Sequence, residues 1–135
     1  MSQSTARSSD LPRILVIDDD VQIGRLMETV LRAEPYDVTV VDDPEEGLRA
    51  HGAAPFDLII LDIFMPAKDG FEVLRCLRGQ DYRKAKVLAV SAGGSQHSYE
   101  YLDTAIMLGA TATLKKPFQP DQLTDAVAAC LRARG

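Results

Sequence analysis

The sequence lacks tryptophan altogether and has only two cysteines, Cys76 and Cys130, which lie far apart in the chain. Neither cysteine has a second thiol or a histidine at the spacing of a metal site, so the sequence contains no disulfide framework and no zinc motif. Such sparse cysteine usage is typical of a reducing compartment, and we expect both side chains to pack within helices. The cytoplasm is therefore the expected location.

Long apolar runs are also absent, and so is an excess of basic residues. No run approaches the ~20 residues of a membrane-spanning helix, and the polar start MSQSTARSSDLPR lacks the apolar segment of a secretory signal. The 15 basic and 20 acidic side chains leave a net charge of −5 and a pI near 4.9. An acidic chain without a basic stripe indicates neither direct nucleic-acid binding nor contact with an anionic membrane.

What the chain does contain is enough for one folded domain. Its 135 residues fall within the usual size of a single domain, and its 46% hydrophobic and 26% charged residues are close to globular averages. Residues 1–12 are polar and rich in serine, and we expect a flexible lead-in there. Residues 13–135 form the predicted domain.

Apolar runs alternate with helical patterns along that domain. We expect strands at residues 14–17, 37–41, 57–62, 86–91 and 111–115. Helices are predicted from the hydrophobic stripe Ile23, Leu26, Met27, Val30 and Leu31, from a similar stripe at 123–131, from the patterns at 44–52 and 71–78, and from Leu102, Ala105 and Ile106 on one face. Five successive β–α units predict a doubly wound α/β domain, a three-layer sandwich whose five-stranded parallel sheet has helices on both faces.

Polar side chains stand where four of the predicted strands end. In open parallel sheets, ligands bind beyond the carboxyl ends of the strands. We therefore expect carboxylate, hydroxyl and ammonium groups to converge at one edge of the sheet. The residues are Asp18, Asp19 and Asp20 after the first strand, Asp62 on the third, Ser91 on the fourth, and Lys115 and Lys116 on the fifth.

This set of groups has the chemistry of a phosphoryl-transfer site. Carboxylates at close range raise one another's pKa unless a cation lies among them. A ligand set of oxygens, with neither histidine nor thiolate, favours a hard ion such as Mg²⁺. A lysine can neutralise a carboxylate or a phosphoryl oxygen, and a hydroxyl can donate to the same oxygen. Asp62 is the carboxylate that we expect to accept the phosphoryl group.

Four motifs at these strand ends resemble the receiver domains of two-component response regulators. They are ILVIDDD, LIILDIFMPAKDG, VLAVSA and LKKPF, in the family's order and spacing, and the resemblance extends from about residue 13 to residue 131. It implies a flavodoxin-like fold with the strand order 2-1-3-4-5. It also implies a role in bacterial phosphorelay signalling, in which the chain catalyses only its own phosphorylation and dephosphorylation.

The resemblance also implies a role for each residue of the site. Asp62 matches the phosphoacceptor in the pattern D-x-x-M-P-x-x-D-G, and Ser91 takes the place of the switch hydroxyl. Lys116, rather than Lys115, matches the family's lysine before a cis peptide bond to Pro117. The implied metal is Mg²⁺, for which Mn²⁺ can substitute. Its implied ligands are Asp18, Asp19, Asp62 and the backbone carbonyl of Phe64, with Asp19 as a direct ligand and Asp18 acting partly through water.

The family further implies protein partners. The phosphodonor would be a sensor histidine kinase or a histidine phosphotransfer protein. The downstream partner would dock on the face formed by the fourth helix, the fifth strand and the fifth helix. Neither nucleic acid nor a membrane is an expected partner. Because the sequence ends at Gly135, soon after the last predicted helix, we expect a stand-alone receiver.

Two features depart from the family's usual pattern. Receivers usually carry an aromatic residue three positions before the lysine, but Thr113 stands there, so an aromatic swing cannot be the output signal. The variable positions beside the phosphate hold Phe64 and Gly93, where the family often has polar residues. We expect Phe64 to shield the phosphoryl group from water and to slow its loss, and Gly93 to be unable to orient a hydrolytic water.

Two other functions fit parts of the sequence. The run DDDV at 18–21 also fits the D-x-D-x-[TV] signature of haloacid-dehalogenase-like phosphatases, with Asp18 as nucleophile and Asp20 as acid. Asp62 would then be idle, and the sequence has no clear acidic pair downstream. A third hypothesis is a receiver that has lost phosphorylation and acts only as an adaptor, against which the intact set of site residues argues.

Other polar residues are expected to serve the fold. Asp20 is predicted to cap a helix, and Asp69 and Gly70 to form the turn before the next one. His51 and His97 stand apart from any motif, and we expect both to lie on the surface.

Overall fold

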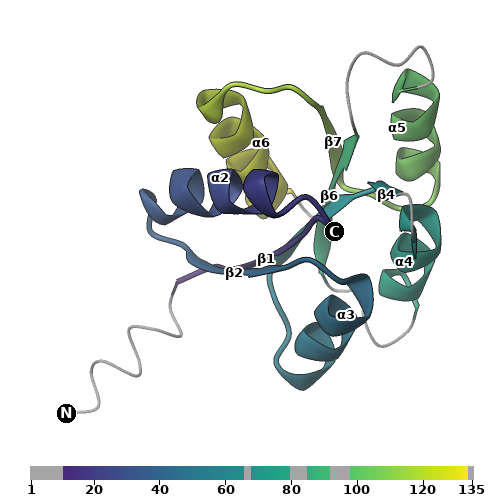
Figure 1. The fold of residues 1–135 in the computed structure, drawn as a ribbon, viewed down its shortest axis with the longest axis horizontal. Coiled ribbons are helices and arrows are strands. Elements are labelled where there is room, and N and C mark those ends of the chain that lie inside the picture. Colours follow the sequence, from purple (N-terminus) through teal and green to yellow (C-terminus); the bar gives the residue numbers. More distant parts are fainter. Residues whose placement is uncertain (1–10, 66–67, 80–84, 92–97, 134–135) are drawn as a thin grey trace.

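Five apolar runs of the chain form the strands of one parallel sheet (Figure 1). The structure is a computed structural model that describes residues 11–65, 68–79, 85–91 and 98–133. The sheet has the order β2-β1-β3-β6-β7, and every pairing within it is parallel, which confirms the expected doubly wound order 2-1-3-4-5. Its strands are β1 (Arg13–Ile17), β2 (Asp37–Val41), β3 (Leu58–Asp62), β6 (Lys86–Ser91) and β7 (Ala112–Lys115).

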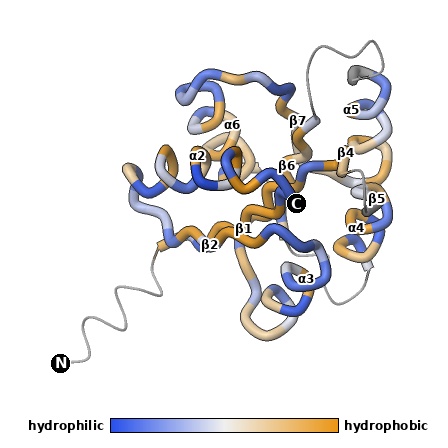
Figure 2. Tube along the Cα trace, in the orientation of Figure 1, coloured by the Kyte–Doolittle hydropathy of each residue, from blue (hydrophilic) through white to orange (hydrophobic). Residues whose placement is uncertain are grey.

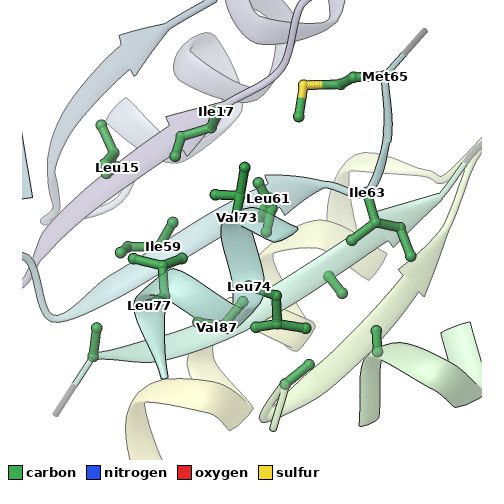
Figure 3. Close-up of a cluster of buried hydrophobic side chains, with 14 of the residues drawn as sticks. Leu15, Ile17, Ile59, Leu61, Ile63, Met65, Val73, Leu74, Leu77 and Val87 are labelled. Carbon is green, nitrogen blue, oxygen red and sulfur yellow. The ribbon is translucent and has the colours of Figure 1, made fainter. Parts of the chain in front are cut away.

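Helices cover both faces of the sheet, because successive strand residues point to opposite sides. In β3, Leu58 and Ile60 pack in one hydrophobic cluster, whereas Ile59 and Leu61 pack in the other. The first cluster is covered by α2 (Val21–Arg32) and α6 (Pro120–Arg132). The second cluster (Figure 3) is covered by α3 (Pro44–Ala53), α4 (Gly70–Leu77) and α5 (Ser98–Met107). This burial on both sides explains why β1 is a nearly continuous apolar run, as Figure 2 shows.

The buried faces of α2 and α5 are narrower than the hydrophobic patterns of their sequences predict. Leu26 in α2 and Ile106 in α5, both expected in the core, are 45% and 47% exposed. Each sits at the edge of its apolar stripe, where the helix surface already turns away from the sheet. Gly24 instead lies inside α2's buried face, and Val40 of β2 is close enough that a methyl group on Gly24 would meet it.

A short two-stranded ladder, which the sequence analysis did not predict, follows the end of β3. Strand β4 (Phe64–Met65) pairs antiparallel with β5 (Lys68–Asp69), directly after the end of β3. Two-residue strands carry no periodic signal, so pattern reading could not find them. The ladder ties the backbone that follows Asp62 to the start of α4.

The described part of the chain begins with a segment that is hydrogen-bonded to β2. Residues 1–10 lie outside the described part of the chain, while the carbonyl of Pro12 accepts a hydrogen bond from the Asp37 amide at 2.9 Å. Within the described residues, no helix combines the length and hydrophobicity needed to cross a lipid bilayer.

His51 is buried in α3, and the expectation of a surface histidine is wrong. It is 3% exposed, its Nδ1 accepts a hydrogen bond from the Phe56 amide at 3.0 Å, and its ring stacks on that of Phe56. The buried residues of α3 are Pro44, Gly47 and His51, which lie on one face but include no large aliphatic side chain. These three positions have helical spacing but are not hydrophobic, so the sequence did not show that His51 would be buried.

We expect His51 to titrate below the usual histidine range. Burial, together with the charges of Arg13 and Arg78, lowers the pKa of His51 below 6.5. Because the unfolded chain then binds the proton more readily than the folded one, the contribution of His51 to stability is lost as pH falls below 6.5. NMR titration of the histidine ring protons measures the midpoint, and His51→Gln assigns the resonance among the two histidines. A midpoint at or above 6.5 would contradict the burial argument.

Candidate functional site

The carboxyl ends of the central strands bring three acidic residues together. Asp18 follows β1, Asp62 ends β3, and one ligand atom from each of Asp18, Asp19 and Asp62 lies within 4.8 Å of the others. Asp18 and Asp62 are only 1% and 5% exposed, whereas Asp19 is exposed. The convergence expected from the strand ends is therefore present, with two carboxylates in the interior and one facing solvent.

Lys116 supplies the positive charge of the cluster. Its Nζ lies 2.8 Å from Asp18 Oδ2 and 3.5 Å from Asp62 Oδ2. Its backbone amide donates to the Ser91 carbonyl at 2.7 Å, and the peptide bond to Pro117 is cis, as expected. Burying two carboxylates is costly unless a partner compensates their charge, and one ammonium group cannot neutralise both.

That imbalance of charge determines the pKa values at the site. Burial and the neighbouring Asp18 raise the pKa of Asp62 from 3.8 to about 6, although Lys116 and the amide of Phe64 oppose the rise. Burial lowers the pKa of Lys116, but the hydrogen bond to Asp18 and the two negative charges outweigh it, so this pKa is raised overall. At pH 7 Asp62 is therefore mostly ionised yet poorly solvated, as a nucleophilic carboxylate needs to be.

Ser91 lies on the strand next to Asp62, at the same edge of the sheet. It ends β6, is 1% exposed, and follows Val90, the residue that pairs with Asp62 in the parallel ladder. Its position at the same sheet edge matches the expectation for the switch hydroxyl. Residues 92–97, which include Gly93 and His97, lie outside the described residues, so the expectations for these two stay predictions.

Phe64 contacts Asp62 through its backbone amide, and its ring contacts α5. The Phe64 amide donates to Asp62 Oδ1 at 3.1 Å. The ring, 52% exposed, stacks on Tyr101 of α5 with centroids 5.6 Å apart and planes at 22°. Phe71, in the first turn of α4, meets Tyr101 edge-on at 6.1 Å. We call Phe64, Tyr101 and Phe71 the aromatic cluster.

Two residues near the site escaped the sequence analysis. Nothing in the sequence around Tyr101 links it to Phe64, which lies 37 positions earlier; only the fold brings the two rings together. Gly70 was predicted as a turn residue. A methyl group there would lie 2.3 Å from the Ile63 Cα, so the start of α4 packs directly on the backbone next to Asp62.

A cavity of about 380 Å³ opens on the β2 side of the cluster. Four of its lining residues are acidic, Asp18, Glu28, Asp42 and Glu46, and one is basic, Arg25. The excess negative charge makes this side of the site favourable for a cation and unfavourable for a free phosphate.

The residues present fit a divalent cation. Their ligand atoms are carboxylate oxygens, which suit Mg²⁺ and Mn²⁺ rather than a soft metal. The raised pKa of Asp62, caused first by burial and then by Asp18, marks a pair of like charges for which Lys116 alone does not compensate. A cation among the three carboxylates would remove that repulsion.

Comparison with known proteins gives one family. The family model described as "Response regulator receiver domain" matches residues 14–128, most of the chain. This match favours neither the phosphatase nor the adaptor hypothesis. Among curated relatives, "DNA-binding response regulator MtrA" of Mycobacterium tuberculosis strain H37Rv is 33% identical over 122 residues, which are 89% of this chain and 50% of that protein. "Uncharacterized transcriptional regulatory protein YkoG" of Bacillus subtilis is 32% identical, with 90% of this chain and 52% of that protein covered.

Solved structures show the same fold. The signal receiver domain of a putative Luxo repressor protein from Vibrio parahaemolyticus has a TM-score of 0.81 and 29% identity, covering 90% of this chain and 91% of that one. The chemotaxis response regulator CheY4 of Vibrio cholerae has a TM-score of 0.79 and 29% identity, with coverage of 89% and 98%. The chain spans about half the length of the curated relatives but nearly all of these receiver structures.

Proposed function

We propose, from the premise that this chain belongs to the response regulator receiver domain family, that Asp62 accepts a phosphoryl group and thereby switches a protein-interaction face. The observation that carries the proposal is the arrangement of Asp62, buried, beside Asp18 and within 3.5 Å of the Lys116 ammonium group. A carboxylate that is ionised at pH 7 but poorly solvated is a competent nucleophile.

The donor would be the phosphohistidine of a sensor histidine kinase or of a histidine phosphotransfer protein. In the transfer, a bond forms between phosphorus and an Asp62 oxygen while the bond between phosphorus and the imidazole nitrogen breaks, and the imidazole takes up a proton. Lys116 neutralises charge on the transferring oxygens, and the Ser91 hydroxyl donates to one of them afterwards.

The acidic residues would hold the metal. Asp19 would bind it directly and Asp18 partly through water, and Asp62 and the Phe64 carbonyl would complete the protein ligands. When bound, Mg²⁺, or Mn²⁺ in its place, supplies positive charge to the phosphoryl oxygens. Beyond phosphorylation and dephosphorylation of its own Asp62, we assign the chain no enzymatic activity.

The downstream partner would dock on the face of α5, β7 and α6. Ile106 and Met107 at the end of α5 are 47% and 84% exposed and offer apolar contact there. The curated relatives named above include DNA-binding proteins of which this chain matches half, and we propose no nucleic-acid or membrane contact for the chain itself. Its proposed location is the bacterial cytoplasm, where a DNA-binding regulator acts.

The phosphatase hypothesis receives no support from Asp20. Its Oδ1 accepts from the Gln22 and Ile23 amides at 3.0 and 3.3 Å, so the carboxylate caps α2, as predicted. Asp18 Oδ1 accepts the Asp20 amide at 2.9 Å, and its Oδ2 is engaged by Lys116. Asp18 and Asp20, the nucleophile and the acid of the phosphatase mechanism, thus form a salt bridge to Lys116 and a helix cap instead.

Intact mass after incubation with acetyl phosphate tests the proposal. We expect the wild-type protein to gain one phosphoryl group, in a reaction that requires Mg²⁺ and is abolished by chelation. Asp62→Asn is expected to gain none, because the amide is not a nucleophile for phosphorus. An adduct that survives in Asp62→Asn and maps to Asp18 would instead support the phosphatase, and absence of any adduct would support the adaptor.

A further inference from the structure

We propose that Tyr101 is a positioning residue that holds Phe64 in place beside the phosphoacceptor carboxylate. The inference rests on the proposed function of Asp62 and deepens it. Phe64 is joined to the site by its backbone, because its amide donates to Asp62 Oδ1 at 3.1 Å. Its ring is joined to α5 by the stack on Tyr101. Phe64 therefore connects the Asp62 carboxylate to α5, a helix that packs on β6 and β7.

Within the described part of the chain, the aromatic partner of the Phe64 ring is Tyr101. Phe64 is 52% exposed, and it stands in a two-residue strand rather than in the main sheet. A half-exposed side chain on so short an element would populate several rotamers without a specific contact. Stacking on Tyr101, with planes at 22°, selects one of them.

Tyr101 is itself well anchored and can act as a platform. It is partly buried against the hydrophobic cluster that covers one face of the sheet, and Phe71 packs edge-on against its ring. It lies in α5, which packs on β6 and β7, the strands that end in Ser91 and Lys115. The platform thus packs directly on the strands that complete the site.

The aromatic cluster is joined to the site through Phe64 and not through β7. Thr113 in β7 carries no ring, so no aromatic side chain reaches the site from that position. Loss of the phosphoryl group requires a water oxygen to bond to phosphorus while the bond to the Asp62 oxygen breaks, releasing inorganic phosphate and the carboxylate. A Phe64 ring held at the mouth of the site limits the approach of that water, and a ring freed from Tyr101 does not.

The half-life of the phosphorylated protein, after removal of acetyl phosphate, is the first measurement. We expect Tyr101→Leu to shorten it about two- to tenfold, since a stacked pair contributes roughly 0.5–1.5 kcal/mol and about 1.4 kcal/mol corresponds to a factor of ten. Phe64→Asn should shorten it at least as much. Tyr101→Phe, which keeps the ring, should behave as wild type, and so should Asp103→Asn, an exposed change on the same helix.

A double variant separates positioning from general stability. In the Phe64→Ala background, Tyr101→Leu should have no further effect on the half-life, whereas a merely structural role would persist there. An unchanged half-life in Tyr101→Leu, or an equal loss in Tyr101→Phe, overturns the inference.

Hydrogen exchange of the Phe64 amide provides a readout that needs no phosphorylation. Tyr101→Leu should accelerate this exchange in the unphosphorylated protein, because the placement of Phe64 holds its amide on Asp62, and Asp103→Asn should not. If the wild-type protein forms no adduct but the exchange accelerates, the proposed function fails and the positioning role stands. If the adduct forms and neither exchange nor half-life changes, the positioning role fails alone.

Discussion

Asp62→Asn is expected to stabilise the metal-free protein at pH 7 by up to about 3 kcal/mol, although it removes the phosphoacceptor. The pKa of Asp62 is raised from 3.8 to about 6, first by burial and then by Asp18. At about 1.36 kcal/mol per pKa unit, ionised Asp62 costs the folded state about 3 kcal/mol. The amide removes the negative charge and keeps an oxygen for the Phe64 amide. Thermal unfolding should show a rise in midpoint on the order of 10 °C.

The raised pKa of Asp62 also predicts how the stability of the protein changes with pH. Because the folded-state pKa of Asp62 lies above its unfolded value, the folded state binds the proton more tightly. The stability contributed by protonated Asp62 is present below about pH 4 and is lost as pH rises to about 6. The difference between wild type and Asp62→Asn should therefore grow across this window, and the contribution of His51 cancels because both proteins share it.

Two controls accompany the measurement. Asp125→Asn makes the same chemical change on an exposed face of α6 and should leave the midpoint within about 2 °C of wild type. Added Mg²⁺ should stabilise the wild-type protein more than Asp62→Asn, since a cation relieves the repulsion between the carboxylates. A variant that is less stable than wild type at pH 7 without metal would show that Lys116 compensates Asp62 fully, contrary to the pKa argument.

Gly70→Ala is expected to destabilise the protein by at least about 3 kcal/mol. The added methyl carbon would lie 2.3 Å from the Ile63 Cα and 2.5 Å from its carbonyl oxygen, which are backbone atoms that cannot rotate away. Overpacking against side chains typically costs about 1–3 kcal/mol, and a clash with backbone belongs at the upper end of that range or above it. Urea denaturation measures the loss.

Gly24→Ala is the matched control for that substitution. Its methyl group would meet only one methyl of Val40, at 2.9 Å, and that side chain can shift. Alanine in a helix interior also gains about 1 kcal/mol over glycine, so the net change should stay within about 1 kcal/mol of wild type. Because Ile63 directly follows Asp62, Gly70→Ala should also slow phosphorylation by acetyl phosphate, and Gly24→Ala should not. If the two variants were equally stable, the Ile63 backbone would have moved away from the new methyl group at little cost, which would contradict the predicted clash.

Sequence reading found the elements whose signals are local. The strands are continuous apolar runs, so their positions were predicted to within about one residue, and Asp18, Asp62, Ser91 and Lys116 followed because strand ends of a parallel sheet share one edge. The strand order came from the resemblance to receivers and agrees with the sheet. Cys76 is exposed although Cys130 is buried, which shows that a helical position alone does not decide burial.

The residues that were misjudged depend on contacts between distant segments. His51 is buried because Phe56 packs against it and α3 packs on β1 and β2. Leu26 and Ile106 are exposed because they lie at the edges of the apolar stripes of their helices. Gly70 is required by the approach of Ile63 and not by a turn, since the positive-φ glycine among the described residues is Gly109.

The sequence by itself determined the α/β class, the sheet edge that carries the site, and the residue types that meet there, because all three follow from periodicity and from the direction of parallel strands. Only the tertiary structure decided how closely those residues approach. The 3.5 Å between Lys116 and Asp62, the raised pKa of Asp62 and the stack of Phe64 on Tyr101 arise from the packing of elements far apart in the chain. Distances and desolvation of that kind depend on three-dimensional packing, for which a local pattern carries no signal.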